Sequence, residues 1–191
     1  MMITKQGLIL LLGFTLIFPQ CVAAQKPQSD AAPVIRLVET DSSSLHPQFR
    51  VEFSNPTDKP LILNLGWMLA NGRGPLYAYA IRLSLTNPDG TRYELELRGP
   101  AGIVGRIDTW IVPLAPDCTF SVPVKLDDYW VPANNIFVLT LTPGKYTVTA
   151  EYTGIAVPQK SANSDMQGIS LMPYWIGTAK SNSLQFTVTS R

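Results

Sequence analysis

Apolar and polar side chains alternate strictly between Tyr146 and Tyr152, directly after a Pro143-Gly144 pair. Proline fixes φ and glycine tolerates positive φ, so this pair favours a tight turn. A period of two is typical of a β-strand with one buried face and one solvent-facing face. The stretch therefore predicts a turn followed by a strand whose apolar side chains, Val148 among them, point into a core.

The same alternation recurs along the chain between clusters of Pro, Gly, Asn and Asp, which mark turns. The stretch from Asn87 to Gly90, for example, predicts a turn that joins its flanking strands into a hairpin. No segment after residue 24 shows a sustained helical period. The expected strands cover residues 34–39, 48–54, 61–65, 77–86, 92–98, 118–126, 136–141, 146–152 and 183–189, with one further short strand within 99–117.

Short strands separated by turn residues, with almost no helix, predict an all-β fold in which two antiparallel sheets pack face to face. We expect an immunoglobulin-like sandwich of about seven to nine strands, and a jelly roll is the alternative. Pro123 cannot donate a ladder hydrogen bond, so we expect its strand at a sheet edge or a bulge. The residues expected in the core are Phe53, Tyr79, Leu95, Phe120, Val148 and Phe186.

The N-terminus has the order of a secretory signal peptide, with basic Lys5, an apolar run over 7–18 and small residues before the expected cleavage point. We expect residues 1–24 to be removed and the remaining protein to be exported, to the periplasm or the exterior. The apolar run is shorter than the about 20 residues of a membrane span. A lipid anchor on Cys21 is the alternative, although Gln20 precedes it and lipidation needs a small residue there.

Beyond the signal peptide the chain has the size of one domain. Residues 25–33 are polar and flanked by proline, which predicts a flexible leader. We expect residues 34–191 to form a single β-sandwich domain that buries roughly 70% of its unfolded surface. A stretch with little periodicity, at about 154–182, predicts a long insertion, and such loops in compact domains are usually functional or disordered.

Charge and cysteine content narrow the possible partners. Residues 25–191 carry 14 basic and 14 acidic side chains, so nothing electrostatic favours nucleic acid or an anionic membrane. Removal of the signal peptide leaves Cys118 as the single cysteine, which excludes an internal disulfide. Cys118 begins the alternation that continues through Phe120, so we expect it to point inward as an inert thiol.

The sequence holds no recognisable catalytic set. His46 is the single histidine, no G-x-S-x-G motif frames a serine, and no set of four nitrogen or sulfur ligands could bind structural zinc. Asp127 and Asp128 could serve sugar hydrolysis, but adjacent strand residues point to opposite faces, and a solvated turn explains them better. We therefore expect no catalytic, cofactor-binding or metal-binding residues.

Aromatic residues in or near expected loops are the remaining candidates. Large rings can cap the ends of a sandwich, and Trp and Tyr are also favoured at binding hot spots. We expect Trp67 to lie in a loop over 66–75, and the stretch Met172–Trp175 is the best single candidate for a recognition surface. The candidate binding residues are Tyr174, Trp175, Trp130 and Trp67.

Three stretches together resemble the immunoglobulin-like domains of exported bacterial proteins: residues 55–60 (NPTDKP), 87–90 (NPDG) and 143–148 (PGKYTV). The likeness covers about residues 48–152 and extends, more weakly, to the bacterial intracellular proteinase-inhibitor family. It implies a tyrosine corner at Tyr146, whose hydroxyl bonds back to the backbone of the preceding turn. The signal peptide and the long C-terminal insertion depart from the inhibitor pattern, and no family site residue carries over.

These observations favour a non-catalytic exported module that binds a protein or a glycan, or that serves a structural role. One alternative is a proteinase inhibitor that presents a loop, either Met172–Trp175 or Gly99–Arg106. Another is a carbohydrate-binding module that uses exposed tryptophans. A hydrolase that uses Asp127 or Asp128 is a further alternative.

Overall fold

The computed structural model describes most of the expected domain. The predicted signal peptide, Cys21 and His46 lie outside the described residues, as does most of the glycine-rich stretch after Gly99. The described residues are 32–41, 47–69, 76–99, 106–157 and 167–189.

Strands make up most of this part of the chain, and its helices are short. No described helix is long and apolar enough to cross a membrane. The elements in chain order are β1 (Val34–Asp41), β2 (Gln48–Ser54), β3 (Leu61–Leu69), β4 (Leu76–Tyr77), β5 (Ile81–Thr86), β6 (Arg92–Leu97), β7 (Ile107–Leu114), β8 (Thr119–Lys125), the 3₁₀-helix η1 (Leu126–Asp128), β9 (Tyr129–Trp130), the 3₁₀-helix η2 (Pro132–Asn134), β10 (Gly144–Gly154), α1 (Gln167–Ser170), β11 (Gly177–Lys180) and β12 (Leu184–Val188).

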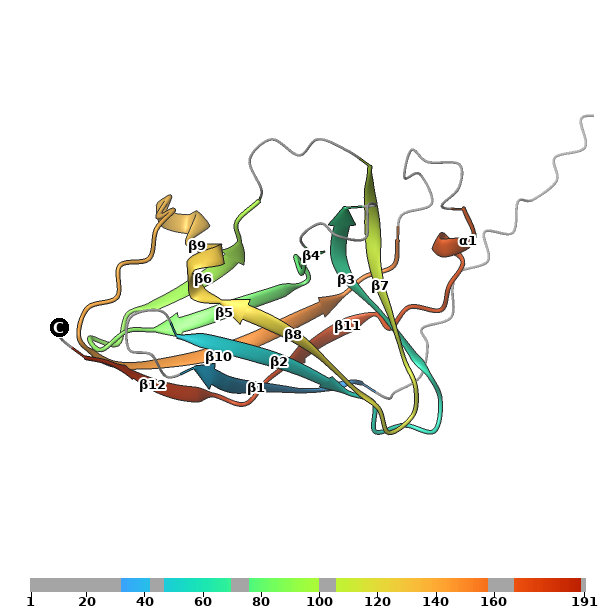
Figure 1. Ribbon diagram of the computed structural model, residues 1–191, viewed down its shortest axis with the longest axis horizontal. Coiled ribbons are helices and arrows are strands. Elements are labelled where there is room, and N and C mark those ends of the chain that lie inside the picture. Colours follow the sequence, from blue (N-terminus) through green and yellow to red (C-terminus); the bar gives the residue numbers. More distant parts are fainter. Residues whose placement is uncertain (1–31, 42–46, 70–75, 100–105, 158–166, 190–191) are drawn as a thin grey trace, which may run out of the picture.

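The strands form three antiparallel sheets (Figure 1). One has the order β1-β2-β8, and a second has the order β11-β10-β5-β6-β9, with β12 also paired to β10. The third, β4-β3-β7, runs steeply across the direction of the other strands in Figure 1. Strand β8, which carries Pro123, lies at a sheet edge as predicted, because proline supplies no amide hydrogen for a further partner.

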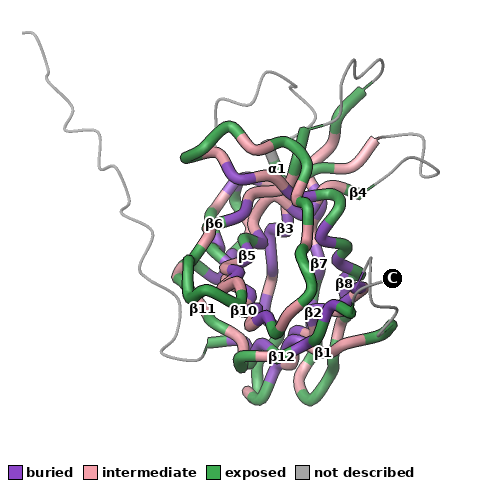
Figure 2. Tube along the Cα trace, turned by 90° about the vertical axis from the view of Figure 1, so that its left-hand side faces the viewer, coloured by how far each residue is buried: buried purple, intermediate pink, exposed green. Residues whose placement is uncertain are grey.

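Aromatic side chains join the first two sheets across the core. Phe49 of β2 packs against Phe186 of β12 with ring centroids 5.5 Å apart, and Phe53 meets Tyr152 of β10 edge-on at 5.2 Å. Figure 2 shows buried residues alternating with less buried ones along the strands, as the period of two requires. The prediction of an all-β sandwich is therefore confirmed.

Two local predictions are also confirmed. The Tyr146 hydroxyl donates to the carbonyl oxygen of Thr142 at 3.0 Å and accepts from its amide at 2.9 Å, which is the bond pattern of a tyrosine corner. Strands β5 and β6 form the predicted hairpin, and the Gly90 amide donates to the Asn87 carbonyl at 3.0 Å across its turn.

One expected strand is interrupted in the structure, and another is absent. The strand expected over 77–86 breaks where the Ile81 amide donates to the Ala78 carbonyl, so β4 pairs with β3 and only β5 joins the hairpin. The stretch 136–141 forms no strand, because Ile136 makes only an isolated bridge to Val131 and no neighbouring strand continues it.

The expected core is right for four of its six residues. Phe53, Leu95, Val148 and Phe186 are buried, and Tyr79 and Phe120 are half-buried. The prediction that Cys118 points inward is wrong. Cys118 is exposed, because the turn before β8 ends the alternation at Thr119. The left-handed φ of 56° at Asp117 marks that turn.

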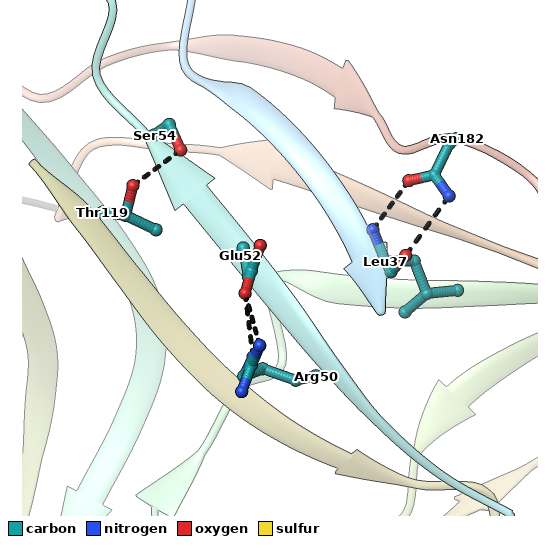
Figure 3. Close-up of polar contacts among 6 residues, drawn as sticks. All are labelled: Leu37, Arg50, Glu52, Ser54, Thr119 and Asn182. Carbon is teal, nitrogen blue, oxygen red and sulfur yellow. Dashed lines mark hydrogen bonds and ion pairs between the residues drawn. The ribbon is translucent and has the colours of Figure 1, made fainter. Parts of the chain in front are cut away.

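An asparagine side chain holds β1 beside the second sheet (Figure 3). The Asn182 amide oxygen accepts from the Leu37 amide at 2.9 Å, and its nitrogen donates to the Leu37 carbonyl at 3.2 Å. Asn182 lies between β11 and β12, so its side chain imitates one step of a β-ladder on the otherwise open edge of β1.

A second asparagine joins the β2–β8 pair to the β3–β7 pair. Asn55 lies between β2 and β3, opposite the turn that connects β7 to β8. The backbone amide of Asn55 donates to the Cys118 carbonyl at 3.0 Å, and its backbone carbonyl accepts from the Asp117 amide at 2.9 Å. The two strand pairs thus form one hydrogen-bonded ribbon that bends at a point we call the Asn55 corner, residues 55–59 and 114–118.

The Asn55 side chain is only 1% exposed, and its polar atoms are fully bonded. The nitrogen Nδ2 donates to the carbonyl oxygens of Lys59 at 2.8 Å and Leu114 at 2.9 Å. The oxygen Oδ1 accepts from the amide and the hydroxyl of Thr57 at 3.1 and 2.8 Å. Both N–H groups and both acceptor sites of this buried side-chain amide are hydrogen-bonded. The side chain therefore holds the two sides of the bend together.

We expect Asn55→Ala to lower the free energy of unfolding by about 2 to 4 kcal/mol, because it leaves buried carbonyl and amide groups without partners. Urea denaturation monitored by circular dichroism measures this change. Asn134→Ala, at an exposed asparagine of η2, is the matched control and should change stability by less than about 0.5 kcal/mol. Equal stability of the two variants would contradict the role given to the corner.

Candidate functional site

Among the described residues, a cleft lies where β3 and β7 cross the end of β5 and β10. It has a volume of about 420 Å³, within the roughly 300–1,000 Å³ typical of small-molecule sites. We call it the Trp67–Tyr79 cleft. The residues that line it are Asn64, Gly66, Trp67, Tyr79, Ala80, Arg82, Thr109, Thr153, Ile155 and Val157.

A β-bulge in β3 turns Trp67 toward this cleft. Asn64 pairs with Ile111 and Gly66 with Trp110, so β3 has one residue more than β7 between these two pairs. Such a bulge shifts the alternation of side chains by one position. A regular strand would place Trp67 on the same face as the buried Leu63, whereas its side chain is in fact 43% exposed. The expected loop over 66–75 is thus wrong at its start, because β3 continues to Leu69.

Only glycine fits at position 66. Its φ of 137° is one that L side chains rarely adopt, and a Cβ would meet the carbonyl oxygen of Tyr77 and the amide nitrogen of Tyr79. The Gly66 amide also donates to Asn64 Oδ1 at 3.2 Å, and the Ala80 amide donates to the Leu65 carbonyl at 3.2 Å. The bulge is therefore held against the turn that carries Tyr79.

Two aromatic rings, Trp67 and Tyr79, form the aromatic wall of the cleft, and a third packs behind Tyr79. The ring centroids of Trp67 and Tyr79 are 4.6 Å apart with a 41° angle between their planes. Tyr77 stacks behind Tyr79 at 6.0 Å and 28°. Burial raises the pKa of the Tyr79 phenol above its usual value, and the nearby Tyr77 adds a smaller effect in the same direction. The phenol is therefore neutral near pH 7, and this wall carries no charge.

Polar groups complete the lining, and one of them, Thr109, stands beside Trp67 as its cross-strand partner. Asn64 donates through Nδ2 to the Ile155 carbonyl at 3.3 Å and is largely buried. The Arg82 guanidinium extends from β5 and pairs with Glu96 of β6 at 3.0 Å. Thr109 and Thr153 add hydroxyl groups from β7 and β10. The cleft thus combines an apolar aromatic surface with an amide, two hydroxyls and a guanidinium.

The other three aromatic candidates do not line this cleft. Trp130 stacks on Phe137 with ring centroids 5.0 Å apart, near η2. Tyr174 and Trp175 are buried, and Trp175 stacks on Tyr152 at 5.6 Å. Of the four candidates, only Trp67 contributes to the Trp67–Tyr79 cleft.

Trp175 is enclosed by two glycines. A Cβ on Gly154 or Gly177 would press against the Trp175 ring, so the strands β10 and β11 approach the indole through residues without side chains. The Trp175 amide donates to the Ile62 carbonyl at 2.9 Å, which ties this segment to β3. Trp175 therefore closes one end of the core, which is the capping role considered for these aromatic residues.

The expected carboxylate pair lies in a turn. Asp127 and Asp128 are both exposed in η1, as the interpretation of a solvated turn anticipated. The Arg98 guanidinium donates to the Asp127 carbonyl at 2.8 Å, so this part of the turn serves as a backbone anchor. Among the described residues, no three His, Cys, Asp or Glu side chains come together to hold a metal ion.

Sequence reasoning missed Asn64, Tyr79 and Arg82 as site residues. A signal was present at Gly66, because a glycine inside a run of strand residues often marks a bulge or a close approach of backbone. That signal places the irregularity in β3 but does not say which side chains face it. Comparison with models of known protein families and with curated proteins finds no match for this chain.

We expect Gly66→Ala to destabilise the protein by about 2 to 4 kcal/mol, since the new Cβ clashes with backbone atoms at an unfavourable φ. Thermal or urea unfolding measures the change. Gly168→Ala is the matched control, because a Cβ at Gly168 meets no atom within 4 Å. A Gly66→Ala protein as stable as the control would show that the bulge does not need glycine.

We also expect Trp67 to supply most of the tryptophan emission that acrylamide quenches. Trp110 and Trp175 are buried and Trp130 is half-covered by Phe137, so Trp67 is the most exposed indole. The variant Trp67→Phe should reduce the quenchable fraction of fluorescence by more than half, a rough expectation from burial. Trp130→Phe is the matched comparison, and a larger loss in that variant would contradict the placement of Trp67.

Proposed function

We propose that this protein is an exported, non-catalytic binding module that holds its ligand in the Trp67–Tyr79 cleft. The observation that carries the proposal is the exposure of Trp67 at the mouth of a cleft backed by Tyr79. Tryptophan and tyrosine are enriched at binding hot spots because they offer large, rigid contact surfaces. The indole is held outward by a bulge at which only glycine fits, so the backbone fixes its position at the cleft.

The cleft is also pre-organised. Six of its ten described lining residues lie in paired strands, and backbone hydrogen bonds tie the adjoining turn to them, such as that from the Thr153 amide to the Ala80 carbonyl at 2.9 Å. A ligand would therefore need to order few side chains, and little of the binding free energy would be lost to conformational entropy. This rigidity supports recognition by a preformed site.

The chemistry of the lining supports a non-catalytic role. The described residues that line the cleft include no carboxylate, histidine, cysteine or serine. General acid–base catalysis needs a titratable group within hydrogen-bonding reach of the substrate, and nucleophilic catalysis needs an activated nucleophile. Arg82 and the threonine hydroxyls supply neither a base nor a nucleophile with a base beside it.

Export is supported by the sequence of residues 1–24, which has the basic, apolar and small-residue order of a signal peptide. Inhibition of proteinases through Met172–Trp175 is less well supported, because Tyr174 and Trp175 are buried and would not reach a protease active site. The ligand of an exported module of this kind would be a small molecule or part of a larger one that fits the cleft.

A screen of a chemically mixed fragment library by two-dimensional NMR tests the proposal. We expect fragments that bind to shift the Trp67 indole N–H resonance while the Trp130 indole resonance stays in place. Trp67→Ala should abolish the shifts that the same fragments cause at the backbone amides of Tyr79 and Ala80, and Phe137→Ala, which alters an exposed ring outside the cleft, should preserve them. Hits that map to another surface, or chemical conversion of the fragments, would contradict the proposed function.

A further inference from the structure

We infer that the ligand of the Trp67–Tyr79 cleft is a neutral saccharide, with a sugar ring against the aromatic side chains and sugar hydroxyls on the polar groups of the lining. The inference rests on the proposed function and adds the chemical class of the ligand. The chemistry of the lining and the balance of charge around it carry the inference.

The aromatic wall suits the apolar face of a sugar ring. Trp67 and Tyr79 lie 4.6 Å apart at an angle of 41°, so they present an inclined surface and not a single flat stack. The π-face of each ring is negative, and the C–H groups on one face of a pyranose are weakly positive. With the indole 43% exposed, a sugar ring could cover apolar surface that water now contacts.

The polar groups of the lining both donate and accept. The Thr109 and Thr153 hydroxyls make no hydrogen bond with any described residue. Each hydroxyl has one donor and two acceptor sites, which is the same inventory as a sugar hydroxyl. Asn64 Nδ2 uses one of its two N–H groups on the Ile155 carbonyl and keeps the second. A saccharide can satisfy this mixture of donors and acceptors, because each sugar hydroxyl both donates and accepts.

The charge around the cleft favours a neutral ligand. Among the described residues of the lining, Arg82 is the one that carries a charge, and Glu96 balances it at 3.0 Å. An anionic ligand would compete with Glu96 for the guanidinium, and a cationic ligand would meet Arg82 without a carboxylate in the lining. The remaining N–H groups of Arg82 can still donate to neutral oxygen atoms, as guanidinium groups carry five donors.

The strands around the cleft do not favour a peptide. Peptides that add to a sheet need an open strand edge with free backbone N–H and C=O groups. Strand β3 is paired with β4 on one side and β7 on the other, and β10 is paired with β5 and with β11 or β12. Of the strands that line the cleft, β3 and β10 thus present side chains and no open edge, whereas β7, the edge strand of its sheet, contributes only Thr109. Most of the lining therefore suits a ligand recognised through rings and hydroxyls.

Saturation-transfer NMR on the protein lacking residues 1–24 tests the inference. The probes are neutral mono-, di- and trisaccharides of glucose, galactose, mannose, xylose and N-acetylglucosamine, with acidic glycans and short peptides as comparison probes. We expect at least one neutral saccharide to bind and to shift the Trp67 indole resonance. Trp67→Ala should weaken that binding by about tenfold or more, and Thr153→Val by a smaller factor.

Phe137→Ala is the matched control and should bind the saccharide as the unaltered protein does, since Phe137 is exposed but does not line the cleft. Circular dichroism checks that each variant is folded. If no neutral saccharide binds while other fragments still shift the Trp67 resonance, the saccharide assignment is overturned and the proposed function stands. Preference for acidic glycans or peptides at Trp67 overturns it equally, and saccharide binding that Trp67→Ala leaves unchanged overturns both.

Discussion

The arrangement of this protein depends on the buried amide of Asn55. Two strand pairs, β2–β8 and β3–β7, share a hydrogen-bonded ribbon, and a ribbon that bends would leave backbone groups unpaired at the bend. Asn55 fills that gap, because it bonds the chain on both sides through its backbone and its side chain. The bend lets β2 and β8 lie over the second sheet, β11-β10-β5-β6-β9, while β3 and β7 cross the end of that sheet.

Further contacts fix the position of β3 against the sandwich. The Tyr152 hydroxyl donates to the Asn64 carbonyl at 3.2 Å, and Ile62 forms a parallel bridge with Tyr174. These bonds tie β3 to β10 and to the segment before β11. The glycine bulge then turns Trp67 outward, over Tyr79 and the end of β5. The bend, the bulge and the buried Trp175 side chain together produce the cleft.

Local rules predicted the elements whose structure is set by nearby residues. The tyrosine corner at Tyr146, the turn at Asn87–Gly90 and the edge position of Pro123 all follow from short-range stereochemistry. Cys118 was misplaced because the alternation was extended through a turn. The left-handed residue of that turn is Asp117, so no glycine in the sequence marks it. Tyr174 and Trp175 are buried by packing without any periodic pattern, so hydropathy alone could not place them.

The candidate site was harder to predict than the fold, because its residues are far apart in the sequence. Trp67 was recognised as an aromatic candidate, but its exposure depends on a register shift against β7 that only the paired strand reveals. Tyr79 and Arg82 looked like ordinary strand residues, and Thr153 lay just beyond an expected strand. They become neighbours only when β3 crosses the end of β5 and β10, which is a non-local event.

The central claim is that the fold brings the Trp67 ring onto Tyr79 in the free protein, before any ligand binds. A nuclear Overhauser spectrum of the unliganded protein, with assigned aromatic protons, measures this contact directly. Ring centroids 4.6 Å apart predict strong cross-peaks between the indole of Trp67 and the phenol ring of Tyr79. Absence of those cross-peaks in a folded sample would contradict the account.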